Sequence, residues 1–174
     1  MARPTLPPTG RERTWPDHQI IVSKTDARGV ITYANAVFCA VAGYTADELE
    51  GQSHNIIRHP DMPRAVFKLL WDTIAAGDEI FAYVVNQAKN GDHYWVFAHV
   101  TPSFDAAGRI VGYHSSRRVP RRDAVAKVVP LYRDLKAIED RAASPKAGLD
   151  ASVAALLAIL EEKRIAYDEF VFSL

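Results

Sequence analysis

The short run RHPDMP, residues 58–63, combines side chains that bind anions with side chains that begin helices. Arg58 can hold a phosphate or carboxylate through its planar guanidinium, and His59 can donate a hydrogen bond beside it. Asp61 and Pro63 stand where a carboxylate and a proline favour the first turn of a helix. The run therefore predicts a ligand-binding loop or only the lead-in to a helix, and the residues alone leave both open.

Several other polar side chains are candidates for a site. Asn86 shares a strand face with apolar neighbours, so its amide would be buried without a partner unless it met a ligand or a neighbouring strand. Asn35 can cap the helix that follows it or contact a ligand. His54 can bond within its own loop or to a ligand. Ser115 can face a ligand or solvent, and for these last three residues the sequence leaves both alternatives open.

Five short β-rich runs must position these residues. Asn90-Gly91 is a strong hairpin signal between the third and fourth runs, and the turns of the other hairpins contain glycine or aspartate. In the fourth run, Tyr94, Val96 and Ala98 share a face whose small side chains leave room for a planar ring, while the other face is also apolar. The runs predict strands within residues 19–23, 30–33, 80–88, 93–102 and 109–118.

Helical patterns fill the remaining segments. Two short helices are expected within 35–50, the second with the capping-box spacing of Thr45 and Glu48. The next helix, over 63–76, carries Trp71 on its apolar face, and periodicity alone predicts core packing for that ring. Pro130 should break or kink the helical segment 121–142. A final helix is expected near 151–170, with an apolar end that should dock on the protein.

Composition excludes several classes of function. Lys plus Arg (21) balances Asp plus Glu (21), which gives no cationic field for nucleic acid. Cys39 is the only cysteine, so an intramolecular disulfide is impossible and a reducing compartment fits. We see no secretory signal and no apolar run long enough for an integral membrane segment, and we expect a cytoplasmic protein. Residues 1–17, rich in proline, predict a mobile arm.

The segments YANAVFCAVAGYTADELEGQSHNIIRHPDMPRAVFKLLW (33–71) and KNGDHYWVFAHVTP (89–102) resemble the FAD-binding PAS sensor domains of bacterial aerotaxis receptors. The resemblance covers roughly residues 18–132 and implies an α+β fold with a five-stranded antiparallel sheet, a cluster of short helices on one face, and C-terminal helices. We therefore expect a flexible arm over 1–17, a PAS sensor domain over 18–120 and a helical extension over 121–174.

The resemblance also implies noncovalent FAD and roles for the candidate residues. Arg58 and His59 would hold the pyrophosphate or adenosine end, and Trp71 would pack near the isoalloxazine or adenine. Asn86 is the candidate for the pyrimidine edge, and Ser115 for the O4 or N5 region. The full predicted set is Asn35, His54, Arg58, His59, Asp61, Trp71, Asn86, Tyr94 and Ser115.

A domain of this kind is expected to be a redox or oxygen sensor rather than an enzyme. It would pass its signal through flanking helices to a separate signalling protein, a chemoreceptor or a kinase pathway component, and could pair as a homodimer. The alternatives are a cofactor-free PAS adaptor and a haem gas sensor with His54, His59 or His99 as axial ligand. Photoadduct chemistry at Cys39 is not expected, because the NCRFLQ-type sequence of light-sensing relatives is absent.

Overall fold

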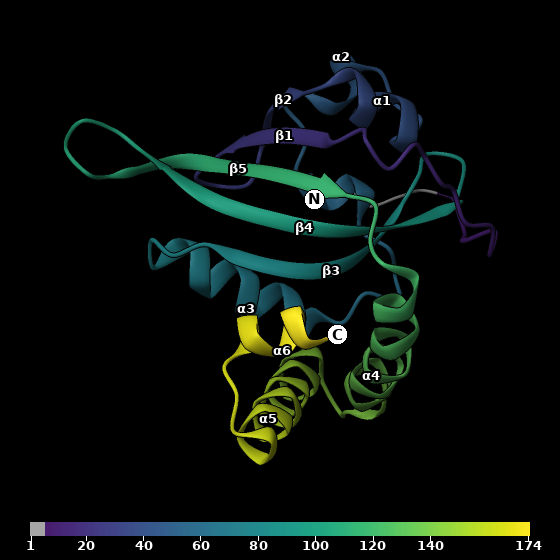
Figure 1. Ribbon diagram of the computed structural model, residues 1–174, viewed down its shortest axis with the longest axis vertical. Helices are drawn as coiled ribbons and strands as arrows, with labels where there is room; N and C mark the ends of the chain where they lie inside the picture. Colours follow the sequence, from purple (N-terminus) through teal and green to yellow (C-terminus); the bar gives the residue numbers. More distant parts are fainter. Residues whose placement is uncertain (1–5) are drawn as a thin grey trace.

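The computed structural model describes residues 6–174 and places five antiparallel strands in one sheet, in the order β2-β1-β5-β4-β3. The predicted α+β PAS fold is confirmed, and each strand falls on one of the predicted runs (Figure 1). The strands are β1 (Ile21–Asp26), β2 (Ile31–Ala34), β3 (Ile80–Gln87), β4 (His93–Phe104) and β5 (Ile110–Arg118).

Both faces of the sheet are covered, as the two-sided apolar pattern of β4 predicts. Val96 and Ala98 are buried on the inner face. On the outer face, the Trp95 ring packs against Tyr132, with 6.0 Å between ring centroids, and Phe97 packs edge-to-face on Phe172 at 6.0 Å. The inner face therefore meets the helices that precede β3, and the outer face meets the C-terminal helices.

The helices before β3 are α1 (Ala36–Ala42), α2 (Ala46–Leu49), the 3-10 helix η1 (His54–Ile57) and α3 (Arg64–Ala75). The predicted capping box is present, because Thr45 accepts from the Glu48 amide and Glu48 accepts from the Thr45 amide. The expected role of Asp61 at the start of α3 is wrong. Its side chain is 81% exposed, and Pro63 occupies the N-cap position without a side-chain hydrogen bond.

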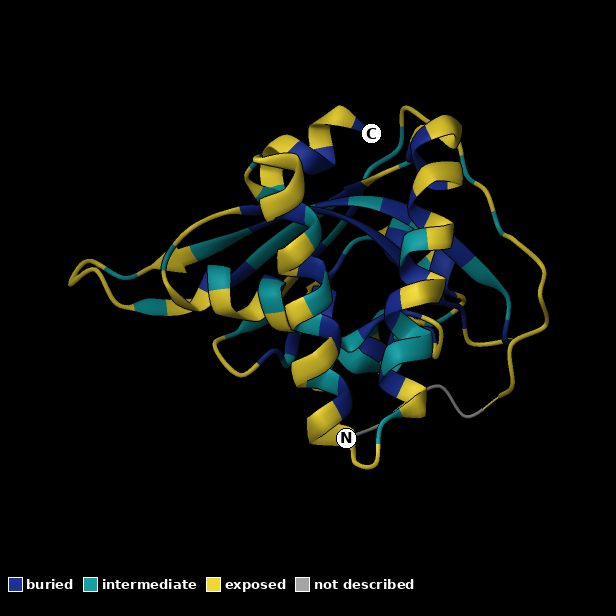
Figure 2. Ribbon diagram, turned by 90° about the horizontal axis from the view of Figure 1, so that it is seen from below, coloured by how far each residue is buried: buried dark blue, intermediate teal, exposed yellow. Residues whose placement is uncertain are grey.

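Three helices follow the sheet: α4 (Arg122–Arg141), α5 (Pro145–Lys163) and α6 (Tyr167–Ser173). Helix α4 continues through Pro130, so the predicted break does not occur, while the alternative of a kink stays a prediction. The single final helix that we expected is two helices, because Arg164 adopts a left-handed conformation with φ 54° and ends α5. Figure 2 shows that α4 and α5 expose one side and bury a narrower stripe. No helix within residues 6–174 is long and apolar enough to cross a membrane.

The apolar chain end docks, as predicted. Phe170 and Val171 are buried, and the Leu174 carbonyl accepts a hydrogen bond of 2.6 Å from Lys127 Nζ. The Phe172 ring lies 4.8 Å from that of Phe81 on β3, centroid to centroid. Helix α6 therefore joins β3 to α4.

The N-terminal segment from residue 6 onward is not free. The Thr9 amide donates to the Gly91 carbonyl at 2.9 Å, and the Arg13 amide donates to the His93 carbonyl at 2.7 Å. The Trp15 ring packs edge-on against Tyr94. Residues 6–15 are therefore paired with the β3–β4 hairpin, residues 1–5 lie outside the described part of the chain, and the mobility of the arm stays a prediction. The three domain boundaries stay a prediction.

Candidate functional site

A cavity of about 320 Å³ lies between the inner face of the sheet, helix α3 and the turn that joins β1 to β2. Small side chains on β4 leave this space, because Val96, Ala98 and Val100 alternate inward along the strand. Polar groups line the cavity among these apolar ones. They come from β1 (Ser23, Thr25), the β1–β2 turn (Arg28), the η1 region (Ser53, His54, Asn55, Arg58), β3 (Asn86) and β5 (Tyr113, Ser115, Arg117).

Trp71 lies at the edge of this cavity rather than in the core. Its side chain extends from α3 and is 37% exposed, and its ring meets Tyr113 edge-to-face at 5.5 Å between centroids. The far end of the indole approaches Gly29 so closely that a Cβ atom there would lie 2.8 Å from Trp71 Cη2. The core packing that periodicity predicted is therefore wrong, and the indole covers part of the cavity wall.

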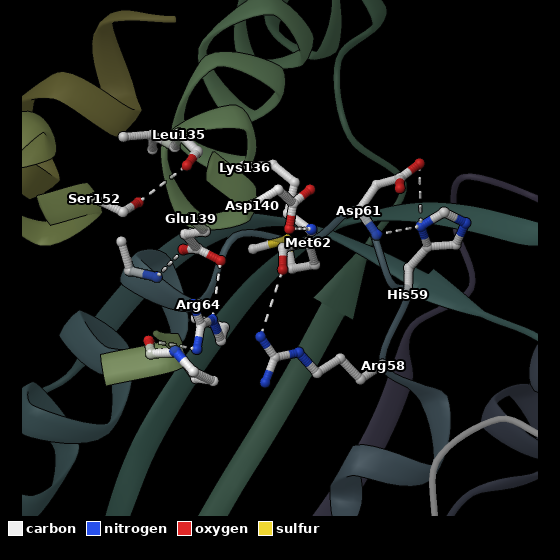
Figure 3. Close-up of polar contacts among 12 residues, drawn as sticks. Arg58, His59, Asp61, Met62, Arg64, Leu135, Lys136, Glu139, Asp140 and Ser152 are labelled. Carbon is white, nitrogen blue, oxygen red and sulfur yellow. Dashed lines mark hydrogen bonds and ion pairs between the residues drawn. The ribbon is translucent and has the colours of Figure 1, made fainter. Parts of the chain in front are cut away.

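The RHPDMP run sends its two basic side chains to different places, as Figure 3 shows. Arg58 lines the cavity, with its guanidinium 4.6 Å from the Phe67 ring centroid and Nη2 3.5 Å from the Met62 carbonyl. His59 is buried on the other side of the loop, where Nδ1 accepts from the Asp61 amide at 3.2 Å. Arg58 thus remains a cofactor candidate, whereas His59 and Asp61 do not line this cavity.

His59 and Asp61 face a second cavity, lined also by His93 and Trp95 of β4 and by residues of α4. The rings of His59 and His93 meet edge-on at 5.8 Å between centroids. Burial is the main cause that lowers the pKa of His59, with the exposed Asp61 carboxylate opposing it. His59 and Asp61 therefore lie away from the first cavity, and their cofactor role stays a prediction.

Asn35 and Tyr94 also lie outside the cavity. Asn35 Oδ1 accepts from the amides of Phe38 (2.9 Å) and Val22 (3.0 Å), and Nδ2 donates to the Ile20 carbonyl at 2.9 Å. The side chain thus caps α1 and ties it to β1. Tyr94 is fully buried beside Trp15, and this burial raises the pKa of its hydroxyl.

The remaining predicted residues are brought together around one space: His54, Arg58, Trp71, Asn86 and Ser115. A backbone bridge between Arg58 and Asn86 places the loop directly beside β3. Asn86 is 4% exposed, as expected for an amide on the inner face. Ser115 pairs with Val100 on one side and with Ser23 on the other, which puts it in the middle of the cavity floor.

Sequence reasoning missed Arg117, which is buried in the cavity wall. Its Nη2 donates to Ser23 Oγ at 2.6 Å, and its guanidinium lies 4.3 Å from the Phe38 ring centroid. Nε and Nη1 are buried without a hydrogen-bond partner in the described part of the protein. The sequence held one signal, since Arg117 is two residues after Ser115 and shares its strand face.

His54 continues this polar line, because its Nε2 lies 3.2 Å from Ser23 Oγ. Burial and the nearby Arg117 charge lower the pKa of His54 to about 3, so the imidazole is neutral at physiological pH. Neutral Nε2 can accept the Ser23 hydroxyl proton while the same oxygen accepts from Arg117. Among the histidines considered as haem ligands, His59 and His99 do not line the cavity, and His54 is held by Ser23.

Cys39 on α1 is half-buried and does not line the cavity, and burial raises the pKa of its thiol. A thiol held in its protonated form away from the cavity gives no basis for adduct chemistry there.

Comparison with known proteins supports the PAS fold. Residues 31–117 match the model of the PAS fold family. The aerotaxis receptor of Escherichia coli (strain K12) is 46% identical over 121 residues, which is 70% of this chain and 24% of the receptor. The nitrogen fixation regulatory protein of Klebsiella pneumoniae is 31% identical over 99 residues, 57% of this chain and 20% of that protein. The chain therefore spans about a quarter or less of the length of these relatives.

A solved structure shares the fold. The dark structure of the blue-light photoreceptor Aureochrome1 LOV aligns with a TM-score of 0.56 and 26% sequence identity, covering 63% of this chain and 82% of that one.

Proposed function

Because the chain belongs to the PAS fold family, we propose that it is a sensor that binds FAD noncovalently in the cavity and reports the redox state of the flavin to a signalling partner. One observation carries the proposal: a slot with a largely apolar wall contains convergent polar groups and three arginines, with no Asp or Glu among its described lining residues. Arg58 and Arg117 lie in the slot, and Arg28 at its edge is already paired with Asp26 at 3.0 Å. An apolar slot suits a planar ring, and the cations suit the negative charge of the cofactor.

The size of the cavity supports a division of roles among its residues. At about 320 Å³ it is near the lower end of ligand pockets, which run from roughly 300 to 1,000 Å³. We propose that the ring system occupies this space and that the phosphates extend to the arginines around it. Asn86 and Ser115 offer polar contacts to the ring, Trp71 covers its edge, and Arg58 is the phosphate candidate.

FAD rather than FMN is the cofactor that the resemblance to aerotaxis receptors favours, since the match includes the run that carries Arg58. When bound, the flavin supplies reversible electron transfer. The chain's own residues bind it, orient it and exclude water. Ser23 and His54 lie 3.2 Å apart, but among the described residues no carboxylate lines the cavity to orient the imidazole as a base, and we propose a switch rather than an enzyme.

A route for the signal runs from the cavity to the C-terminal helices through β3. Asn86 of β3 lines the cavity, and in the same strand the Tyr83 carbonyl accepts a hydrogen bond of 2.6 Å from Tyr132 of α4. A shift of β3 would therefore move α4 directly. The partner, proposed to be a chemoreceptor or a kinase pathway component, would bind the exposed side of these helices, where Leu157 of α5 is 51% exposed.

The test begins with the colour of the purified protein. We expect a yellow protein that releases intact FAD on heating, with chromatography distinguishing FAD from FMN. Ala98→Leu should fill the slot and abolish binding without unfolding the protein, because the new methyl groups enter existing space. Val111→Leu, on an exposed position of β5, is the control and should bind normally. If the protein is colourless and stays colourless with added FAD, the proposal is refuted and the cofactor-free adaptor becomes the favoured function.

A further inference from the structure

Arg117 is a buried cation whose partners inside the protein are incomplete. Its side chain is 2% exposed, and Nη2 donates a hydrogen bond to the neutral hydroxyl of Ser23. Nε and Nη1 have none within residues 6–174. A buried charge without an opposite charge is costly, and the protein keeps one only where something else compensates it.

The surroundings of Arg117 do not supply that compensation. Within the described part of the chain, the residues that line the cavity include no Asp or Glu, and the neighbouring His54 is neutral. Phe38 offers its ring face to the guanidinium, which contributes only a modest attraction. The cavity wall therefore contains a fixed positive charge with two guanidinium nitrogens, Nε and Nη1, left to donate, which suits an acceptor that carries or gains negative charge.

We propose that Arg117 stabilises the anionic, two-electron-reduced form of a flavin ring and so sets the redox equilibrium at which the sensor switches. This inference rests on the proposed function. Two electrons from an external low-potential donor, such as dithionite in vitro, and one proton from solvent convert the neutral oxidised ring to a reduced ring with one negative charge. The guanidinium interacts with that charge and not with the neutral ring, so it shifts the equilibrium toward reduction.

Ser23 and Phe38 position the guanidinium for this role. The 2.6 Å hydrogen bond to Ser23 fixes one end of the planar fork, and the Phe38 ring supports its face. Because the head group is held before any ligand arrives, little entropy is lost when the ligand binds.

The test uses the full chain with three substitutions. Arg117→Met removes the charge at similar volume, and Arg117→Lys keeps it. Arg118→Met removes the same charge from the next residue, which is exposed on β5, and serves as the control. Circular dichroism and thermal melting first establish that each variant is folded. Binding of oxidised and reduced FAD and riboflavin is then titrated, and the reduction equilibrium is measured against a reference dye.

We expect the reduction equilibrium constant to fall at least tenfold in Arg117→Met, about 30 mV for a two-electron couple. Affinity for reduced flavin should fall tenfold more than affinity for oxidised flavin, equally for FAD and riboflavin. Arg117→Lys should stay within about threefold of the wild type, and Arg118→Met should be unchanged.

Three results would overturn the inference while leaving flavin binding established. The first is an unchanged equilibrium constant in Arg117→Met. The second is weaker binding of FAD but not of riboflavin, which would assign Arg117 to a phosphate. The third concerns the case in which Arg117→Met binds no flavin at all. If Arg117→Lys then also fails to bind flavin, the inference is overturned. A wild-type protein that takes up no flavin would instead refute the proposed function, and this inference with it.

Discussion

Glu139 of α4 lies against Arg64 at the start of α3, with Oε2 3.1 Å from the guanidinium Nε. Its other oxygen accepts from the Ala65 amide, also at 3.1 Å, so a carboxylate from a distant helix caps α3. The Glu139 side chain is 1% exposed, and Arg64 continues to the Pro145 carbonyl at 2.8 Å (Figure 3). The contact ties the end of the RHPDMP run to the C-terminal helices.

Removal of this carboxylate should destabilise the protein. Glu139→Ala leaves the Ala65 amide without its acceptor and Arg64 without its opposite charge, and we expect a loss of about 2–4 kcal/mol in the free energy of unfolding. Glu139→Gln keeps an acceptor and should lose less. Asp140→Ala is the matched control, because its exposed pair with Lys136 should contribute less than about 1 kcal/mol. Urea unfolding measures all three, and equal losses at positions 139 and 140 would contradict the capping role.

The hydrogen bond from Tyr132 to the Tyr83 carbonyl should contribute measurably to the docking of α4. Tyr132→Phe removes only the hydroxyl and should cost about 1 kcal/mol in unfolding free energy, because the bond is buried. Tyr33→Phe, whose residue is 44% exposed on β2, should cost almost nothing. Thermal melting compares the two variants, and a neutral Tyr132→Phe would show that this bond does not hold α4 to β3.

Alanine variants of Gly29 and Gly108 distinguish the effect of backbone strain from the effect of contact with Trp71. Both adopt positive φ, 79° and 76°, but a Cβ at Gly29 would lie 2.8 Å from Trp71 Cη2, whereas at Gly108 it would meet nothing within 4 Å. Each alanine variant should lose about 1–2 kcal/mol from the left-handed backbone. Only Gly29→Ala should also displace the indole and weaken flavin binding. Fluorescence quenching during flavin titration measures the difference, and identical affinities would contradict the role of Trp71 at the cavity edge.

Because of His54, the free energy of unfolding should decrease as the pH is lowered. Its pKa in the folded protein is about 3, below the value of about 6.5 in an unfolded chain, so the unfolded state binds more protons between these values. The stabilisation is present above about pH 6.5 and is lost as the pH falls toward 3. Because His54 is only half-buried, we expect His54→Asn to remove about 1–2 kcal/mol of the loss between pH 7 and 4.5. His18→Gln, at a largely exposed position, should follow the wild type. A pH series of urea unfolding curves measures this, and an unchanged slope in His54→Asn would refute it.

Arg58 and His59 should differ in their effect on flavin binding, because only Arg58 lines the cavity. Arg58→Ala should weaken FAD binding at least tenfold in folded protein, since a charged hydrogen bond contributes about 1.5–3 kcal/mol. His59→Ala should reduce stability through the lost contact with the Asp61 amide, with a smaller effect on affinity. Equilibrium titration measures both. Equal losses of affinity at the two positions would contradict the separation that the structure shows.

The local patterns of the sequence determined the elements. Alternation along 93–102 predicted a strand with two apolar faces, Asn90-Gly91 predicted its hairpin, and Thr45 with Glu48 predicted a capping box that is present. The inner-face amide of Asn86 was also predicted correctly, because strand parity fixes the side to which a residue points. These features depend on neighbours within a few residues, and for that reason they can be predicted from the sequence alone.

The tertiary structure decided which members of the RHPDMP run face the cavity. A loop has no periodicity, so the opposite directions of Arg58 and His59 follow only from the bridge to β3 and the packing of α4. The cap of α3 comes from Glu139, far along the chain, instead of the adjacent Asp61. The tertiary structure also decided the environment of Arg117. A charge on a strand becomes a buried, partly unpaired cation only when β1, α1 and η1 close around it.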